Sequence, residues 1–457
     1  MDYSAANHEL WNLILQLGYI AGAILLANLL TRRIGFVRKS LMPVAVLAGF
    51  LLLLAEYLGL RVDGEVMETL VYHGIALGFI AMSLRVPSER TEGKGDLTGL
   101  KSGAVIVSTY MVQGVTGLGL TLLLSYTLFP SLFKAAGLLL PMGYGQGPGQ
   151  ANNIGSTYES LGFAGGRSFG LAIAAAGYLV ACVVGVILLN ILSRRGKLRT
   201  SHGGASEPGV DFFQSRGEIP ISESIDKLSV QIAMLLVVYL VTYLASWGLT
   251  SAIAAAAPGL AATVNTLIWG FNFIIGSALA VLLRVLLERS RRAGWITRQY
   301  QNNYLLNRIS GFFFDIMIVA GIASIRLEEL SGLWVPFLLL AAAGGVVTWL
   351  HLCLVCKAVY KDYYYEGLIS MFGMMTGTIS SGVLLLREID PDLATPAAGN
   401  LVTGSSFGII LGAPVLILVG LAPKSEVLSW ITLGLAAVYL LLLDLLIFRL
   451  HRRKVKK

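Results

Sequence analysis

The 457-residue chain is 56% hydrophobic and only 13% charged, and its formal net charge is +8. Soluble domains carry about 25% charged residues, so these charges are too few to cover a water-soluble surface, and the composition predicts an integral membrane protein. Three cysteines exclude a disulfide scaffold. Two of them form Cys353-x-x-Cys356 inside an apolar run, without the second Cys/His pair of a zinc site, which favours simple packing.

Apolar runs long enough to cross a membrane follow one another along most of the chain. About 20 residues are needed to span roughly 30 Å of hydrocarbon. The N-terminal MDYSAANHEL has no basic region and the first run is of full length, so we expect no cleavable signal peptide. Eleven spans are predicted, at residues 11–31, 41–60, 66–84, 102–129, 168–193, 228–250, 262–287, 309–325, 333–356, 397–421 and 428–448.

Two further apolar stretches, 135–161 and 365–386, are interrupted by glycine. The interruptions are Gly143, Gly145, Gly147, Pro148 and Gly149 in the first stretch, and Gly373, Gly377 and Gly382 in the second. Gly and Pro weaken helices, and lipid cannot satisfy exposed backbone groups. We therefore expect each stretch to form a re-entrant hairpin that is buried among other helices.

The distribution of Lys and Arg predicts the orientation in the membrane. If the N-terminus is outside and each hairpin returns to its starting side, 29 of the 34 basic residues are cytoplasmic. This bias agrees with the positive-inside rule. The net charge therefore indicates membrane insertion rather than nucleic-acid binding, with the C-terminus in the cytoplasm. The first hairpin enters from outside and the second from inside.

Three short motifs recur in the same order in the two halves of the chain. They are Ser83-Leu84-Arg85 with Ser324-Ile325-Arg326, Gly137-Leu138 with Gly367-Leu368, and Gly166-x-Ser168-Phe169-Gly170 with Gly404-x-Ser406-Phe407-Gly408. We expect a first repeat at 1–193, a cytoplasmic linker at 194–227, a second repeat at 228–421, and an extra helix with a basic tail at 422–457. Five spans per repeat place the two copies in opposite orientations, as in many secondary transporters, whose solute site lies near the bilayer midplane.

The first interrupted stretch carries polar groups suited to a small solute. Four glycines in seven residues allow a sharp turn that exposes backbone N–H and C=O groups. Such N–H groups and the ends of short helices suit a carboxylate, and unwound carbonyls suit sodium. A phosphate cradle is not indicated, because no Gly-Lys-Ser/Thr follows. The candidate solute-binding residues are Gly143, Tyr144, Gly145, Gln146, Gly147, Gln150, Asn152 and Asn153.

The second interrupted stretch carries hydroxyl groups instead of amides. They can coordinate sodium or a solute, or they can bond back to the helix backbone and serve helix packing. The candidate solute-binding residues here are Gly373, Thr376, Gly377, Thr378, Ser380 and Ser381. The sodium candidates are Asp315, Asn153, Thr376 and Ser381.

Few ionisable residues lie inside the predicted spans, where a charge is costly unless it is paired or wetted. Asp315 can bind a cation or pair with Arg308. His73 is ambiguous in the same way, with a satisfied interior histidine as the simpler interpretation. Asp444, near the end of the last span, is expected to extend to the membrane surface.

These features resemble the bacterial glutamate:sodium symporter family over roughly residues 10–421. The resemblance rests on Gly143–Gly149 followed by Tyr158-Glu159-Ser160-Leu161-Gly162-Phe163, on Ser83-Leu84-Arg85, and on Lys361-Asp362-Tyr363 leading into Gly373–Gly377. The chain departs from the family's Gly-Gly-His-Gly-Thr-like and Gly-Phe-Gly-Leu-Gly-like motifs and has an extra C-terminal span, as in a divergent member. The resemblance implies sodium-coupled import of an acidic amino acid, with a hairpin-bearing domain that moves against a scaffold.

The expected function is therefore a sodium-coupled symporter for glutamate or a related small carboxylate, in a bacterial inner membrane. Its partners would be the solute, sodium and lipid, with a possible homodimer; no catalytic residue, enzymatic cofactor or nucleic acid is expected. A proton-coupled organic-anion carrier that uses Asp315 or His73 is the alternative. A channel is less compatible with two hairpins entering from opposite sides. A membrane enzyme has no supporting motif in the sequence.

Cysteine labelling tests the predicted hairpins. An impermeant reagent added outside should label cysteines introduced at both ends of 135–161 and at neither end of 365–386. The reagent should show the reverse pattern in inside-out vesicles, because each hairpin returns to its own side. Labelling of one hairpin's two ends from opposite sides would mean that it crosses the membrane, and the inverted repeat would then be wrong.

Overall fold

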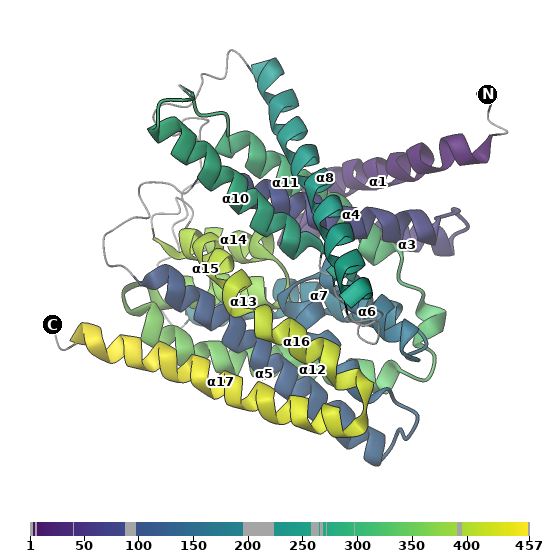
Figure 1. Cartoon of the computed structure of the whole chain (residues 1–457). Coiled ribbons are helices and arrows are strands. Elements are labelled where there is room, and N and C mark those ends of the chain that lie inside the picture. Colours follow the sequence, from purple (N-terminus) through teal and green to yellow (C-terminus); the bar gives the residue numbers. More distant parts are fainter. Residues whose placement is uncertain are drawn as a thin grey trace. The chain divides into compact units, whose positions relative to one another are not determined.

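The computed structural model describes residues 3–4, 7–39, 41–86, 97–194, 224–256, 265, 268–270, 272–296, 298–390 and 395–455. All regular elements in these ranges are helices, and no strand occurs among them (Figure 1). The predicted all-helical architecture is confirmed for this part of the chain. Most of the predicted 194–227 linker lies outside the described residues.

Eight helices among the described residues are long and apolar enough to cross a membrane. They are α1 (His8–Arg33), α4 (Gly64–Leu84), α5 (Thr98–Tyr126), α7 (Gly166–Arg194), α8 (Ser224–Ala256), α11 (Asn303–Ala323), α12 (Trp334–Val359) and α17 (Glu426–Val455). Each corresponds to a predicted span. The protein is thus an all-α, multi-pass membrane protein.

The three other predicted spans look different in the structure. Residues 41–60 contain a shorter apolar helix, α3 (Val44–Tyr57), and 262–287 is described as a helix only from the start of α10 (Asn272–Arg292). Residues 397–421 are divided into α15 (Ala397–Leu411) and α16 (Ala413–Leu421), with a bend of 52° at the break. Pro414 explains the bend, because it lacks the N–H that would continue the helical hydrogen bonding.

Shorter elements make up the interrupted stretches and the connections. They are α2 (Gly35–Lys39), η2 (Lys134–Leu138), η3 (Pro141–Gly145), α6 (Pro148–Ser160), η6 (Leu327–Leu330), η7 (Lys361–Tyr363), α13 (Tyr364–Thr376), α14 (Ile379–Arg387) and η8 (Ala422–Lys424). The first interrupted stretch corresponds to η2, η3 and α6. The second corresponds to α13 and α14.

The chain divides into two compact units. The first consists of Met1–Glu68, Leu97–Ala205 and Ile318–Lys457, and the second of Thr69–Asp96 and Ser206–Met317. Both interrupted stretches belong to the first unit. The repeat boundaries at 1–193 and 228–421 concern internal symmetry rather than compactness, and they stay predictions.

Helix α5 is the central element of the first unit. It contacts α12, α15 and α17 as well as η2, and α17 runs alongside it (Figure 1). A Cβ at Gly117 would overlap the carbonyl oxygen of Gly137, so glycine is required where η2 meets α5. Thr121 fastens this contact: its Oγ1 donates to the Lys134 carbonyl at 2.7 Å and accepts from the Gly137 N–H at 3.3 Å.

The two ends of each interrupted stretch lie close together in space. Phe133 precedes η2, and its ring centroid lies 5.3 Å from that of Tyr158, near the end of α6. In the second stretch, Tyr365 at the start of α13 packs in one hydrophobic cluster with Leu386 and Ile389 at the end of α14. Both stretches are therefore helical hairpins, and their re-entrant insertion into the membrane stays a prediction. We call 134–160 the first hairpin and 364–387 the second hairpin.

The second unit contains α8 and α10 together with most of α4 and α11. Its core is a single cluster of aliphatic side chains: Ile80, Ala81, Leu84, Leu235, Val238, Ala280, Leu306 and Ile309. Ser310 Oγ donates to the Gly78 carbonyl at 3.0 Å, which joins α11 to α4 within this unit. The core of the second unit is therefore built from apolar contacts rather than around a buried polar site.

Replacing Gly117 by alanine should destabilise the first unit. The added methyl group must displace the backbone of the first hairpin, at a cost of about 1–3 kcal/mol. Gly119→Ala is the matched control on the same helix, because nothing lies within 4 Å of its Cβ position; alanine there should stabilise α5 by roughly 0.5–1 kcal/mol. Thermal unfolding in detergent should place the Gly117→Ala variant below the wild type and Gly119→Ala at or above it. Equal unfolding temperatures would contradict the close packing of η2 on α5.

Candidate functional site

The first hairpin is helical up to a break at Gly147. Its first arm widens from the tight 3₁₀ helix η2 into the π-helical turn η3, a geometry that often marks functional sites. Gly147 then adopts φ +85°, a left-handed conformation that glycine accepts readily, and Pro148 starts α6. The first arm is held in place by Tyr144, whose hydroxyl donates to the Ala341 carbonyl at 2.7 Å.

The second hairpin is broken at Gly377 and Thr378. Helix α13 ends at Thr376 and α14 begins at Ile379. A Cβ on Gly373 would lie 2.9 Å from the Cα of Gly382, so the two arms approach each other backbone to backbone. This close approach explains why the arms contain glycine at both positions.

The two breaks meet inside the first unit. The Cβ position of Gly147 is 3.8 Å from Thr378 Cγ2 and 3.8 Å from the Tyr178 hydroxyl of α7. Gln113 of α5 reaches the same region, and its Nε2 donates to the Met375 carbonyl at 2.9 Å and to Thr348 Oγ1 at 2.8 Å. Two hairpins and three long helices therefore converge on one buried polar centre.

Several buried polar atoms of Gln113 and of the helices that start at the two breaks have no hydrogen-bond partner among the described residues. They are Gln113 Oε1, Gln150 Nε2 and Oε1, Asn152 Oδ1, Thr378 Oγ1 and Ser381 Oγ. Leaving a buried polar group unpaired costs about 1–3 kcal/mol, and native proteins seldom contain such groups close together. The amide and hydroxyl groups that contain these atoms can bind a small polar solute or a cation.

The short helices add partial charges to the same region. Both α6 and α14 start at the hairpin breaks, and neither N-cap residue, Gly147 or Thr378, supplies a side-chain hydrogen bond to its helix. The N-terminal ends of helices favour anions. The C-terminal end of α13, with the Thr376 carbonyl, favours cations. The amide and hydroxyl side chains between these ends carry no net charge.

The structure thus brings most of the predicted site residues together. Gly143 packs against Ala174 of α7, and Gly145 packs against the ring of Tyr110. Gln150, Asn152 and Asn153 are buried on α6. Thr376 Oγ1 donates to the Phe372 carbonyl at 2.8 Å, which is the back-bonding alternative, although its oxygen can still accept. Gln146 is half-buried at the end of η3, and the side chain of Ser380 lies outside the described part.

Two candidates belong to the second unit. Asp315 is exposed on α11, and no ion pair between it and Arg308 is found among the described residues. Arg308 instead lies over the Tyr304 ring, 5.3 Å from its centroid. His73 Nδ1 lies 2.6 Å from the Tyr239 hydroxyl. Neither residue is in the compact unit that holds the hairpin breaks.

Sequence patterns missed the residues that the long helices contribute to the centre. Gln113, Tyr110 and Thr348 lie in runs that were predicted only as spans. The one available signal was Gln113, since an amide in the middle of an apolar span is costly unless it has a purpose.

The base of the first hairpin carries charged residues. The Arg167 guanidinium pairs with the Glu68 carboxylate, and Ser156 Oγ donates to Glu68 Oε1 at 3.1 Å. The backbone N–H of Arg167 donates to Glu159 Oε1 at 3.0 Å. This network anchors the last turns of α6, far along the helix from the break.

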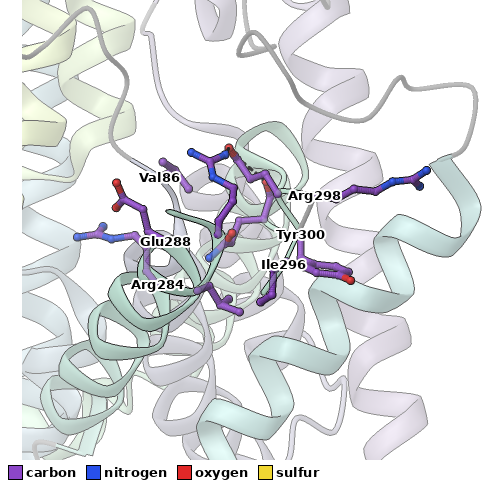
Figure 2. A pocket seen from close by; sticks show the side chains of 10 residues that line it. Val86, Arg284, Glu288, Ile296, Arg298 and Tyr300 are labelled. Carbon is purple, nitrogen blue, oxygen red and sulfur yellow. Dashed lines mark hydrogen bonds between the residues drawn. The ribbon is translucent and has the colours of Figure 1, made fainter. Parts of the chain in front are cut away.

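A surface hollow in the second unit is lined by arginines but is not a convergent site (Figure 2). Arg284 Nη1 donates to the Arg85 carbonyl at 2.9 Å, and Arg291 Nη1 donates to Gln299 Oε1 at 3.0 Å. Figure 2 shows the side chains of Arg284 and Arg298 pointing away from each other. The hollow contains none of the residues that converge at the hairpin breaks.

No protein-family model matches the sequence, and no curated protein matches it either.

Gln150→Met should uncouple stability from function. Gln150 is 1% exposed and neither end of its amide is bonded among the described residues, so the apolar replacement should leave the unfolding temperature in detergent unchanged or higher. Ligand binding should be lost, because the amide is removed from the polar centre.

Gln231→Met is the matched control. Gln231 is also 1% exposed, but its Nε2 donates to the Tyr300 carbonyl and its Oε1 accepts from the Asn302 N–H. The same substitution should cost about 1–3 kcal/mol there, while the folded fraction keeps its activity. Destabilisation of Gln150→Met by a similar amount would show that the Gln150 amide is structural.

Proposed function

We propose that the protein is a secondary active transporter that couples the movement of sodium to the uptake of glutamate or a related small carboxylate. The observation that carries the proposal is the group of unpaired, buried polar atoms at the point where two helical hairpins break. A purely structural core would have paired these atoms or replaced them with apolar groups.

The solute's carboxylate fits the start of α6 and α14, where backbone N–H groups and helix dipoles face the breaks. The Gln150 and Gln113 amides supply donors and acceptors for the remaining polar groups of the solute. Recognition by dipoles and amides, rather than by arginine, leaves the ligand free to dissociate on the other side of the membrane.

Sodium fits the oxygen-rich side of the same centre. Thr378 Oγ1, Ser381 Oγ and Asn152 Oδ1 are unpaired oxygens among the described residues. The carbonyls at the end of α13 directly precede Thr378 in the chain. Hard cations prefer such oxygen ligands. A bound cation would order the breaks and raise the affinity for the anionic solute, and the solute would do the same for the cation.

Alternating access supplies the transport cycle. In the proposed topology, eleven spans form two inverted repeats and an extra helix, with the N-terminus outside and the C-terminus in the cytoplasm of a bacterium. The two hairpins then reach the centre from opposite faces and can gate it in turn. The likeness to glutamate:sodium symporters in the glycine-rich segments supports the same cycle.

Two alternatives are testable against this proposal. A proton-coupled carrier of the same architecture would use titratable groups such as His73 or Asp315. A membrane enzyme would need a nucleophile, and Ser108 lies 2.9 Å from His351 Nε2. Asp444 faces the same Nε2 atom, at 3.8 Å, whereas a Ser-His-Asp triad requires the acid at the other ring nitrogen. This geometry does not favour catalysis.

Uptake by purified protein in liposomes tests the proposal. Radiolabelled glutamate should accumulate only with an inward sodium gradient. Gly147→Val should abolish uptake, because it strains a left-handed residue and fills the space beside Thr378. Gly59→Val is the control, with φ +105° but nothing within 4 Å of its Cβ position; it should retain uptake.

Three results would contradict the proposal. Uptake that follows a pH gradient without sodium would indicate the proton-coupled carrier. Non-saturating currents would indicate a channel. Equal uptake by the Gly147→Val and Gly59→Val variants would move the site away from the hairpin breaks.

A further inference from the structure

A second buried polar cluster lies between α5, α12 and α17 in the first unit. Ser108 is fully buried, and His351 is 8% exposed. The Nε2 atom of His351 lies 2.9 Å from Ser108 Oγ and 3.8 Å from Asp444 Oδ1. Asp444 therefore turns toward His351 rather than extending to the membrane surface, which corrects the expectation from the sequence.

Ser108 Oγ lies between two hydrogen-bond partners, 3.1 Å from the Val105 carbonyl oxygen and 2.9 Å from His351 Nε2. The tautomer of the His351 imidazole decides whether Nε2 donates to the Ser108 hydroxyl or accepts from it. Asp444 Oδ1 is buried and has no hydrogen-bond partner among the described residues. A carboxylate oxygen that is buried without a donor is costly, even though the Asp444 side chain as a whole is 20% exposed. The cost disappears if Asp444 holds a proton itself or if His351 is positively charged beside it.

Both solutions place one more proton on the pair than a neutral histidine and a free carboxylate would hold. The pair then has no net charge, which is the cheapest state in a medium of low dielectric constant. The other ionisable residues on the three helices are Lys101, Tyr110, Tyr126, Cys353, Cys356, Lys357, Glu426, Tyr439, Arg449, His451, Arg452, Arg453 and Lys454. None of the ion pairs among the described residues joins one of them to His351 or Asp444.

Two of the three helices around this cluster, α5 and α12, also contact the second hairpin. Helix α5 carries Ser108 and, five residues later, Gln113, which donates to the Met375 carbonyl at the end of α13. Helix α12 carries His351 and, one turn earlier, Thr348, which accepts from Gln113 at 2.8 Å. A change in the charge or position of His351 therefore alters the position of Thr348 and Gln113, which contact the end of α13.

We propose that Ser108, His351 and Asp444 form a proton-binding site that controls the transport centre at the hairpin breaks. The neutral pair, with one shared proton, is the transport-competent state. Loss of that proton leaves a buried negative charge, which shifts α12 against α5 and disturbs the contact with Met375. This inference rests on the proposed transport function, since control has meaning only if the hairpin breaks bind the solute.

The test uses Asp444→Asn, His351→Gln and the double variant in the full-length protein. Glutamate uptake by the wild type at a fixed sodium gradient should fall about tenfold per pH unit above the midpoint of proton loss. Asp444→Asn has no carboxyl group, cannot form the buried negative charge, and should keep its uptake rate across the same pH range. His351→Gln retains the Asp444 carboxyl without its partner, so its uptake should still fall with pH but at a shifted midpoint. The double variant should behave like Asp444→Asn, because it too has no carboxyl group.

Infrared spectroscopy supplies a readout that needs no transport. Raising the pH should change the carbonyl stretch of a protonated carboxyl group, or the imidazole bands, in the wild type. The change should be absent from Asp444→Asn, and its midpoint should be shifted in His351→Gln. His8→Gln and Glu9→Gln, both on the first turn of α1, should retain it.

The two readouts separate the failure of each proposal. If no protein transports glutamate, the proposed function fails, and the infrared change alone decides the proton site. If all proteins share one pH profile of uptake and one infrared change, the proton site is overturned while the transport proposal stands. If Asp444→Asn keeps the pH dependence, or if His351→Gln keeps the wild-type midpoint in both readouts, the shared-proton pair is overturned.

Discussion

Close approach of backbones at glycine is the constraint on which the first unit depends. The Gly117 and Gly137 backbones touch where η2 lies on α5, and the Gly373 and Gly382 backbones touch between the arms of the second hairpin. A side chain at Gly117 or Gly137 would push the first hairpin away from α5, and one at Gly373 or Gly382 would push apart the two arms of the second hairpin. The breaks would then no longer meet, and the polar atoms that face them would separate. The glycines therefore determine where the buried polar groups lie, although they contribute few of those groups themselves.

The polar centre is a free-energy cost that the rest of the unit must offset. Six buried atoms without a partner among the described residues, at about 1–3 kcal/mol each, would exceed the stability of many small domains. The large buried surfaces of α5, α7 and α13 supply the opposing contribution. A binding site assembled in advance in this way spends no energy on reorganisation when the ligand arrives, which is why such strain is found at functional sites.

Local patterns in the sequence predicted the helices and the two hairpins because each depends on its own residues. Gly147 and Gly377 interrupt apolar runs, and both interruptions are breaks in the structure. The partners of the hairpins could not be found in this way, because Gln113 meets Met375 across more than 250 residues. Asp315 and His73 stood out as charges in apolar runs, yet they belong to the other compact unit. Position in three dimensions decides such cases, and a single sequence contains no record of it.

The last helix illustrates how one polar residue changes the interpretation of an apolar span. Most of α17 exposes leucine and other apolar side chains, as expected for contact with lipid. Asp444 is the one acidic residue in the middle of α17, and its carboxyl group faces His351. His351 in turn is hydrogen-bonded to Ser108 of α5. A helix that served only to return the chain to the cytoplasm would have no need of that carboxyl group. Its presence beside His351 makes α17 part of the polar interior of the unit rather than a membrane anchor.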